Sequence, residues 1–245
     1  MLSLLSDFNL SDLSLSQLST NNKLLINTLN AHSFNTTHYD VEFKIALQQS
    51  NVLLSDGISI VGAMRLLTGQ RLRKIAGADL FFFEMERLNV IGGKCFFLGS
   101  SDKTLHTIQE RAANEYPKVQ VYSYSPPYKA AFSDEENKIM IDAVNAVEPD
   151  VLFIGMTAPK QEKWAFQHFD QLNATHIGCI GAVFDFYAGT VNRAPKWMIK
   201  IGLEWFYRLV KEPKRMWRRY LLGNLKFIGY VVREKWMIRK FKNHP

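Results

Sequence analysis

Short apolar runs and amphipathic segments alternate along most of the chain. Most of the apolar runs end in glycine, asparagine, aspartate or serine, which is typical of buried strands followed by turns. They span 23–30, 51–57, 94–101, 119–125, 150–155 and 176–186. Segments with helical spacing lie between them, at 38–50, 59–69, 78–88, 102–116, 134–147 and 160–169. Strands that alternate with helices of about 10–15 residues predict a parallel sheet in an α/β domain.

Charge divides the chain into two unequal parts. Residues 193–245 hold 15 Lys and Arg against 3 Glu, a net charge of +12, and residues 1–192 hold 15 Lys and Arg against 20 Asp and Glu, a net charge of −5. We therefore predict a Rossmann-like parallel sheet flanked by helices at 1–192, and a basic, aromatic, helical C-terminal appendage at 193–245. Such a basic segment predicts an anionic partner, and the alternative is a merely solvated helix face.

The stretch EWFYRLVKEPKRMWRRYLLG, at 204–223, carries six Lys or Arg and five aromatic residues around Pro213. The proline predicts two short helices rather than one, because it removes a helical hydrogen bond. Basic residues recur every three or four positions and form one stripe, while apolar residues lie largely on another face. The stripe comprises Arg208, Lys211, Arg215, Arg218 and Arg219. A second basic and aromatic run, at 227–242, predicts an extension of the same surface.

The sequence holds no uncharged apolar run of about 18 residues, so we expect no membrane-spanning helix. Its first residues do not resemble a secretory signal, since Asp7 and Asp12 interrupt them. Cys95 and Cys179 stand alone in apolar runs and are expected to be buried, reduced thiols. These features predict a cytoplasmic protein that at most lies on a membrane surface.

The expected strand ends carry small residues, among them Gly99 and Gly155. In a parallel α/β sheet, ligands bind beyond the carboxyl ends of the strands, and small residues let a ligand approach the backbone there. This arrangement favours a nucleotide or a phosphosugar as ligand. Neither the G-x-G-x-x-G fingerprint nor the G-x-x-x-x-G-K-[ST] loop is present, which disfavours classical NAD binding and P-loop hydrolysis.

Three loops carry candidate chemistry. Asp56 closes an apolar strand, where a half-buried carboxylate can act as a general base or simply stabilise a turn. Gln161 and Glu162 begin a helix, where they can serve a site or cap the helix, and Lys160 beside them can face a phosphate. Asp185 is expected at a strand end, where it can bind a ribose or base edge or hold a loop. The residue types alone leave each of these pairs of interpretations open.

Metal ligation has little support in the sequence. It contains no D-x-D and no H-E-x-x-H, and its six histidines are scattered. A transferase without D-x-D must stabilise a leaving diphosphate with cationic side chains or helix N-termini. We therefore predict no metal and no cofactor.

An ordered set of motifs resembles the WecG/TagA/CpsF family of bacterial glycosyltransferases. The motifs are T-x-N (28–30), LLSDGISIV (53–61), RKIAGADL (73–80), FFLG (96–99), PPY (126–128), GMTAPKQEKW (155–164), GAVFDFYAGTVNRAPKW (181–197) and GLEWFYRLVKEPKRMWRRY (202–220). The likeness covers roughly 23–223 and is specific in combination. It implies an inverting, metal-independent enzyme of surface polysaccharide biosynthesis. Such an enzyme moves a sugar from a UDP-sugar donor to a saccharide linked to polyprenyl diphosphate.

The resemblance also implies roles for single residues. Asp56 matches the general base, Thr28 and Asn30 match a polar pair beside it, and Gln161 matches an active-site glutamine. Asp185 matches a nucleotide-contacting aspartate. Arg208, Arg215 and Arg218 match arginines of an appendage that completes the site at the membrane.

One departure from the family pattern concerns an arginine position. Lys74 stands where the family usually has arginine, with Arg73 beside it. Lysine keeps the charge but loses the bidentate fork. The role of that arginine is therefore shared between Arg73 and Lys74, or weakened.

The predicted partners are the UDP-sugar, the lipid-linked acceptor and the anionic inner face of the cell membrane, with self-association off the membrane because of the exposed apolar tail. N-acetylmannosamine, its uronic acid and glucose- or glucuronic-type sugars all remain open as the transferred sugar. A nucleic-acid-binding module is the first rival, but it leaves Asp56, Gln161 and Asp185 without a role, so we predict no nucleic acid. A non-catalytic subunit of a polysaccharide assembly complex is the second rival. A dehydrogenase is the third, and the missing fingerprint disfavours it.

Overall fold

The computed structural model describes residues 3–242, in which six parallel strands form one sheet. The strand order across the sheet is β2-β1-β6-β5-β3-β4. The strands are β1 (Leu24–Leu29), β2 (Val52–Ser55), β3 (Lys94–Gly99), β4 (Gln120–Tyr124), β5 (Val151–Gly155) and β6 (His176–Cys179). This sheet confirms the predicted Rossmann-like α/β fold, and all its strands end at one edge, called the carboxyl edge below.

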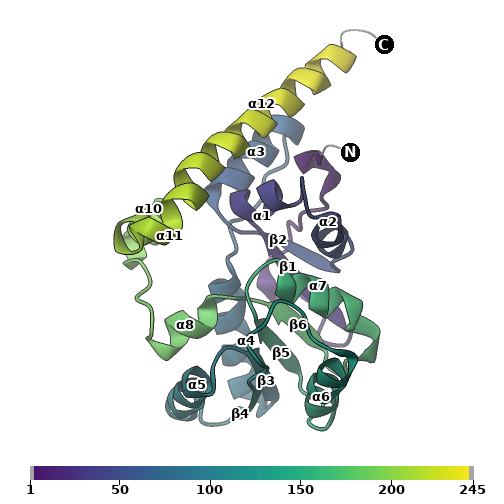
Figure 1. The fold of residues 1–245 in the computed structure, drawn as a ribbon, viewed down its shortest axis with the longest axis vertical. Helices are drawn as coiled ribbons and strands as arrows, with labels where there is room; N and C mark the ends of the chain where they lie inside the picture. The colour runs from purple at the N-terminus through teal and green to yellow at the C-terminus, as the bar shows by residue number, and fades with distance from the viewer. Residues whose placement is uncertain (1–2, 243–245) are drawn as a thin grey trace.

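Helices cover both faces of the sheet (Figure 1). Those of the first half are α1 (Ala31–Thr36), α2 (Val41–Gln48), α3 (Ile58–Thr68), α4 (Gly77–Ile91), α5 (Asp102–Glu115) and α6 (Asp134–Asn145). Those of the second half are α7 (Lys160–Gln167), α8 (Val183–Ala188), α9 (Lys196–Lys200), α10 (Glu204–Lys211), α11 (Pro213–Trp217) and α12 (Gly223–Lys242). Helices α4, α5 and α8 share one buried cluster with the sheet, and α6 and α7 share another on the opposite face.

The central strand β5 shows why the sheet is buried on both sides. Phe153 packs into the cluster with α4, α5 and α8, while Leu152 and Ile154 pack into the cluster with α6 and α7. Successive side chains of a strand point to opposite faces, so a continuous apolar run suits a strand that is covered twice.

One expected helix is confirmed with narrower bounds, and one expected strand was partly wrong. The segment 38–50 was expected to form one helix, but the structure has α1 before it and starts α2 only after Asp40, whose side chain accepts a hydrogen bond from the Phe43 N–H (2.9 Å). The run 176–186 was expected to be one strand, but β6 stops at Cys179. Gly181 then turns the chain with φ of +54°, and Asp185 lies within helix α8. A continuous apolar run does not distinguish a strand from a short buried helix.

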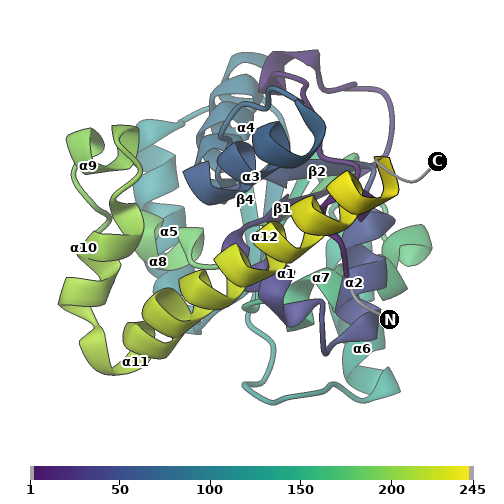
Figure 2. The ribbon, with the colours of Figure 1, turned by 90° about the horizontal axis from the view of Figure 1, so that it is seen from above.

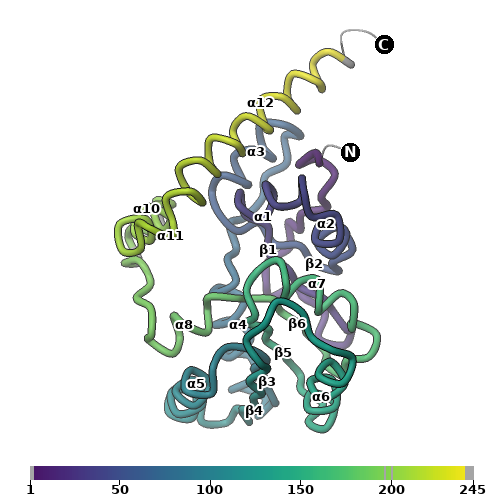
Figure 3. Tube along the Cα trace, in the orientation of Figure 1, coloured from purple at the N-terminus to yellow at the C-terminus, as the bar shows by residue number. Residues whose placement is uncertain are grey.

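The predicted break at Pro213 is confirmed. Helix α10 ends at Lys211, and Pro213 opens α11, where its missing N–H costs no helical hydrogen bond. A π-helical turn at Arg218–Leu222 follows and leads into α12. Figure 3 shows the chain leaving α8 and crossing to α10 and α11 at the side of the molecule.

Helix α12 packs along α1 and α3, as Figure 2 shows from above. Its Phe227 and Val231 are buried in one cluster with Phe34 of α1. The buried carboxylate of Glu234 accepts hydrogen bonds from the backbone N–H groups of Leu5 (2.7 Å) and Ser6 (2.9 Å). The last helix is thus fixed to the body of the protein. Of the helices that the structure describes, none is long and apolar enough to cross a membrane.

A buried ionic network ties the start of β6 to α4. His176 and Glu84 are 1% and 0% exposed, and the His176 Nδ1–Glu84 Oε1 distance is 2.7 Å. His176 Nε2 lies 2.8 Å from the Ser19 carbonyl oxygen, and Arg87 Nε donates to the other oxygen of Glu84 at 2.8 Å. Both ring nitrogens face acceptors, which favours the doubly protonated ring. Burial alone would lower the pKa of His176, but Glu84 and the Ser19 carbonyl outweigh it and raise the pKa.

Replacing Glu84 by glutamine should lower the free energy of unfolding by about 3 kcal/mol, because a charged partner of a buried pair is removed. A histidine with a raised folded-state pKa stabilises fully below its unfolded value of about 6.5, and that stability is lost as the pH rises through the folded pKa. Urea unfolding between pH 6 and 9 should therefore show this loss in the wild type and not in Glu84→Gln. The exposed neighbour Glu86→Gln should change stability by less than about 0.5 kcal/mol. Equal pH slopes in wild type and Glu84→Gln would contradict the charged His176.

Candidate active site

Asp56 and Asn30 meet at the carboxyl edge, one residue beyond the paired ends of β1 and β2. The Asn30 side-chain oxygen caps α1 by accepting from the Ser33 N–H at 3.0 Å. Its amide nitrogen is left to donate to Asp56 Oδ2, at 3.4 Å. Gly57 follows with φ of +111°, a conformation that suits glycine and that lets the chain turn from β2 into α3. The carboxylate is therefore held by a neighbouring strand.

The surroundings of Asp56 favour a basic carboxylate. Its side chain is half-buried, so protein surrounds it while solvent still reaches it. Burial raises the pKa of Asp56 and Glu204 adds to that rise, while the Asn30 hydrogen bond and the charges of Lys74 and Arg219 oppose it. A carboxylate with a raised pKa accepts a proton more readily than an exposed one, as a general base requires.

Lys74 and Arg73 take different positions. The charge of Lys74 acts on Asp56, and its ammonium donates to the Ile199 carbonyl at 3.3 Å. Arg73 is exposed, and its backbone carbonyl accepts from the Ser55 hydroxyl at 2.5 Å. Of the two cations, Lys74 therefore lies on the Asp56 side.

The appendage brings several guanidinium groups to the same edge. Arg219 is close enough to act electrostatically on both Asp56 and His32, and Arg208 and Arg215 act on Arg219 in turn. The Nε atoms of Arg208 and Arg219 are buried, and neither has a hydrogen-bond partner within residues 3–242. Burial, followed by the charge of Arg219, lowers the pKa of His32 to about 4, so that ring is neutral near pH 7. Clustered guanidinium groups suit an anionic ligand.

Arg218 and Arg219 are neighbours in a π-helical turn, and successive side chains of a helix point in different directions. The N–H of Gly223 donates to the Arg218 carbonyl, the i→i+5 bond of a π-helix. Arg218 is exposed, and its guanidinium lies 5.3 Å from the centre of the Trp217 ring. Of the two neighbours, the sequence selected Arg218, whereas Arg219 is the one beside Asp56.

Asp185 lies on α8 near the same arginines. Burial raises the pKa of Asp185, and the charges of Arg215 and Arg208 oppose that rise. The Arg208 guanidinium sits 5.2 Å from the centre of the Phe186 ring, next to Asp185. Arg215 also pairs with Glu212 at 2.9 Å. The structure thus joins Asp185 to the arginine group, although it places Asp185 on a helix.

Gln161 and Glu162 form a buried pair in the first turn of α7. Gln161 is 4% and Glu162 3% exposed, and Gln161 Nε2 donates to Glu162 Oε1 at 2.9 Å. Glu162 Oε2 and Gln161 Oε1, the one oxygen of that amide, are buried and have no partner in the described part of the chain. Burial raises the pKa of Glu162 to about 7, against the opposing effect of the Gln161 hydrogen bond. A Cβ atom at Gly181, just beyond β6, would lie 3.5 Å from the Gln161 amide, so this pair also belongs to the carboxyl edge.

The remaining predicted site residues take varied positions. Thr28 lies in β1, two residues before Asn30, so both side chains point to the same face of the sheet. The ammonium of Lys160 donates to the Lys129 carbonyl at 2.9 Å and lies over the Phe132 ring, so it is held by the loop after β4. Gly99 and Gly155 pair across β3 and β5, and a Cβ at Gly155 would come within 2.8 Å of the Phe184 ring. Protein packing therefore uses the space at Gly155.

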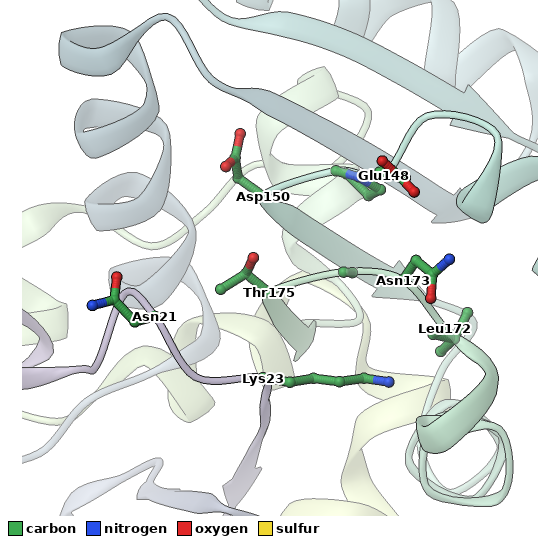
Figure 4. A pocket seen from close by; sticks show the side chains of 9 residues that line it. Asn21, Lys23, Glu148, Asp150, Leu172, Asn173 and Thr175 are labelled. Atoms are coloured by element: carbon green, nitrogen blue, oxygen red, sulfur yellow. The ribbon is translucent and has the colours of Figure 1, made fainter.

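A shallow cavity of about 320 Å³ opens at the opposite edge, before the starts of β1, β5 and β6. Lys23, Asp150 and Thr175 line it (Figure 4). Asp150 there accepts the Lys94 N–H at 2.7 Å, a contact that serves the sheet. Among residues 3–242, no group of three or more His, Cys, Asp or Glu side chains is arranged to hold a metal ion.

Comparison with known proteins shows the family of this chain. The family model described as "Glycosyl transferase WecG/TagA/CpsF family" matches residues 6–241. The chain belongs to this family. An N-acetylglucosaminyldiphosphoundecaprenol N-acetyl-beta-D-mannosaminyltransferase of Bacillus subtilis (strain 168) is 31% identical over 223 residues, covering 90% of this chain and 84% of the relative. A protein of the same name from Staphylococcus aureus (strain MW2) is 29% identical over 227 residues, covering 90% and 84%.

The roles of the site residues stay predictions. The sequence motifs select Asp56, Asn30 and Asp185, and the structure gathers these three residues near the arginines. They missed His32, which lies in an unrecognised helix, and did not select Arg219 over Arg218. The basic stripe predicted from the sequence contains both arginines. No local pattern in the sequence predicts the π-helical turn.

Proposed function

We propose that the chain transfers a sugar from a UDP-sugar to a saccharide linked to polyprenyl diphosphate, in the synthesis of a surface polysaccharide. The observation that carries this proposal is the Asp56–Asn30 pair at the carboxyl edge together with Arg219, whose charge acts on Asp56 and whose Nε, like that of Arg208, has no partner among the described residues. A base beside an anion site is what glycosyl transfer from a nucleotide diphosphate needs. The names of the relatives, which specify an acceptor on diphosphoundecaprenol, support the acceptor class.

The reaction is a single displacement. Asp56 takes the proton of the acceptor hydroxyl, whose oxygen attacks C1 of the donor sugar as the bond from C1 to the UDP oxygen breaks. Attack from the side opposite the leaving group inverts the anomeric carbon. Arg208, Arg215 and Arg219 neutralise the negative charge that develops on UDP, in place of a metal ion. Asp185 binds the nucleotide.

The transferred sugar is of the hexose or N-acetylhexosamine type. The relatives are named as N-acetylmannosaminyl transferases, which makes N-acetylmannosamine the first donor sugar to test. Its uronic acid and the glucose- or glucuronic-type sugars are the alternatives.

The enzyme meets its acceptor at the cytoplasmic face of the membrane. Large apolar side chains are exposed at spacings of three and four along the last helices, and Trp236 is 61% exposed. This apolar stripe comprises Leu221, Leu225, Ile228, Val232 and Trp236. Exposed basic residues, such as Lys226 and Arg233, accompany it. An apolar helix face with basic and aromatic residues is typical of binding at an anionic lipid surface. The apolar stripe starts two residues after Arg219, which supports a membrane surface beside the site.

The test is UDP release with a panel of UDP-sugars, a synthetic saccharide diphosphate polyprenol and EDTA. We expect release that depends on the lipid acceptor and persists in EDTA, and the active donor names the sugar. Release only with added metal would overturn the role of the arginines. A folded, vesicle-bound protein that releases UDP from none of the donors would indicate a non-catalytic subunit instead.

A further inference from the structure

Glu162 is a buried carboxylate at the candidate active site to which the proposed reaction assigns no role. Its Oε1 accepts from Gln161 Nε2 at 2.9 Å, and its Oε2 is buried without a partner among residues 3–242. A carboxyl group this deeply buried costs free energy unless it is paired. That cost suggests that Glu162 serves the site, and Gln161 is the side chain through which it can do so.

The hydrogen bond to Glu162 determines which way the Gln161 amide faces. An amide has an NH₂ end that only donates and an oxygen end that only accepts. With Nε2 directed to Glu162, the Oε1 atom faces away from it, and Oε1 has no partner within the described residues. The amide lies against Gly181, which has no side chain to cover it. An acceptor without a donor is therefore held at the carboxyl edge of the sheet.

We propose that Glu162 is a positioning residue that orients Gln161 so that its carbonyl oxygen accepts a hydrogen bond from a hydroxyl or amide N–H of a bound sugar. This rests on the proposed glycosyl transfer and specifies the group that Gln161 recognises. The sugar belongs either to the UDP-sugar or to the lipid-linked acceptor. If the sugar belongs to the donor, loss of the orientation raises the KM for the UDP-sugar. If it belongs to the acceptor, the KM for the lipid-linked acceptor rises.

The orientation depends on the charge of Glu162. An ionised carboxylate only accepts, which selects the amide as observed, whereas a protonated one can donate to Gln161 Oε1 after the amide rotates. The titratable group that faces Glu162 from β6 is the Cys179 thiol, whose pKa is raised by burial and then by Glu162. Lys163, next on α7, is directed outward to Asp40, which caps α2 (3.1 Å), and to Glu42 of α2 (3.3 Å). Lys160, before it, bonds to the Lys129 carbonyl.

A double-mutant cycle tests the proposal on the full chain. Glu162→Met, which removes the acceptor at similar volume, should lower kcat/KM about tenfold, and Glu162→Gln, which keeps an acceptor, should retain part of the activity. In the Gln161→Ala background, Glu162→Met should have less than about a twofold effect, because Glu162 acts through Gln161. A rise in KM for one substrate alone identifies the sugar that Gln161 contacts. A tenfold loss in both backgrounds would overturn the proposal.

A second measurement does not depend on activity. The side-chain ¹⁵N–¹H signals of Gln161, assigned by their absence in Gln161→Ala, should shift with a midpoint near pH 7 in the wild type. The same signals should not titrate there in Glu162→Met. Signals that are independent of pH in the wild type would overturn the orientation by Glu162. If the wild type transfers no sugar while these signals titrate, the proposed function fails and the orientation of Gln161 stands.

Discussion

Replacing Asp56 by asparagine should lower kcat by about 10²- to 10⁴-fold, the range that general base catalysis contributes. Asparagine keeps the size of the side chain and can still bond to Asn30, but it has no lone pair basic enough to take the acceptor proton. The loss should appear in kcat at saturating donor and acceptor. UDP release, measured with the UDP-sugar that the panel identifies as the donor, gives this loss of kcat directly.

The stability of Asp56→Asn separates lost chemistry from lost folding. Because the pKa of Asp56 is raised in the folded state, native protein binds more protons than unfolded protein between the two pKa values. The stability of the wild type therefore falls as the pH rises from the unfolded value of about 3.9 through the raised folded pKa. Asparagine removes that fall, so above this window urea unfolding should show the variant to be at least as stable as the wild type. An inactive but more stable variant is typical of an active-site substitution.

The matched control is Asp142→Asn, which changes an exposed carboxylate on α6 that pairs only with Lys138. It should keep full activity and nearly unchanged stability. Wild-type turnover in Asp56→Asn would remove Asp56 as the base. A less stable Asp56→Asn protein, whose activity falls in step with the folded fraction, would instead assign Asp56 to the fold.

The sheet was predictable because most of its strands are apolar on both faces and are separated by amphipathic helices. Segment 94–99 and the helix after it, for example, appear in the structure within a residue or two of their expected limits. The errors fall where short elements meet. The run from His176 to Phe186 hides the end of β6 because its apolar residues continue into α8, and α1 is only one short helix between β1 and α2.

The site was less predictable than the fold because it depends on contacts between distant segments. Asp56 and Asn30 each follow the end of a parallel strand. The carboxyl ends of parallel strands lie at one edge of the sheet, so the proximity of these two residues was predictable. The pairing of Gln161 with Glu162 needs burial, which adjacent polar residues at a helix start do not reveal. The approach of Arg219 to Asp56 depends on the path of the appendage across the molecule, which has no local signal in the sequence.

Arg219→Ala should lower kcat by about 10²- to 10³-fold, the loss seen when one preorganised donor to a developing anion is removed. Its buried Nε has no acceptor in the described part of the chain, so the charge is available to the diphosphate of UDP. Interactions made mainly in the transition state reduce kcat more than they raise KM. Arg219→Lys should recover only part of the rate, because lysine keeps the charge but not the planar fork.

Two companion variants make this test specific. Lys226→Ala removes an exposed cation of α12, and it should leave kcat with a short-chain, water-soluble acceptor unchanged. Arg218→Ala tests the neighbour that the family resemblance selects and that the structure shows exposed beside Trp217. If Arg219 is the group that reaches the leaving diphosphate, Arg218→Ala should lose far less than Arg219→Ala. A full rate in Arg219→Ala together with a large loss in Arg218→Ala would mean that Arg218 stabilises the diphosphate. The π-helical turn would then have to rewind when the substrates bind.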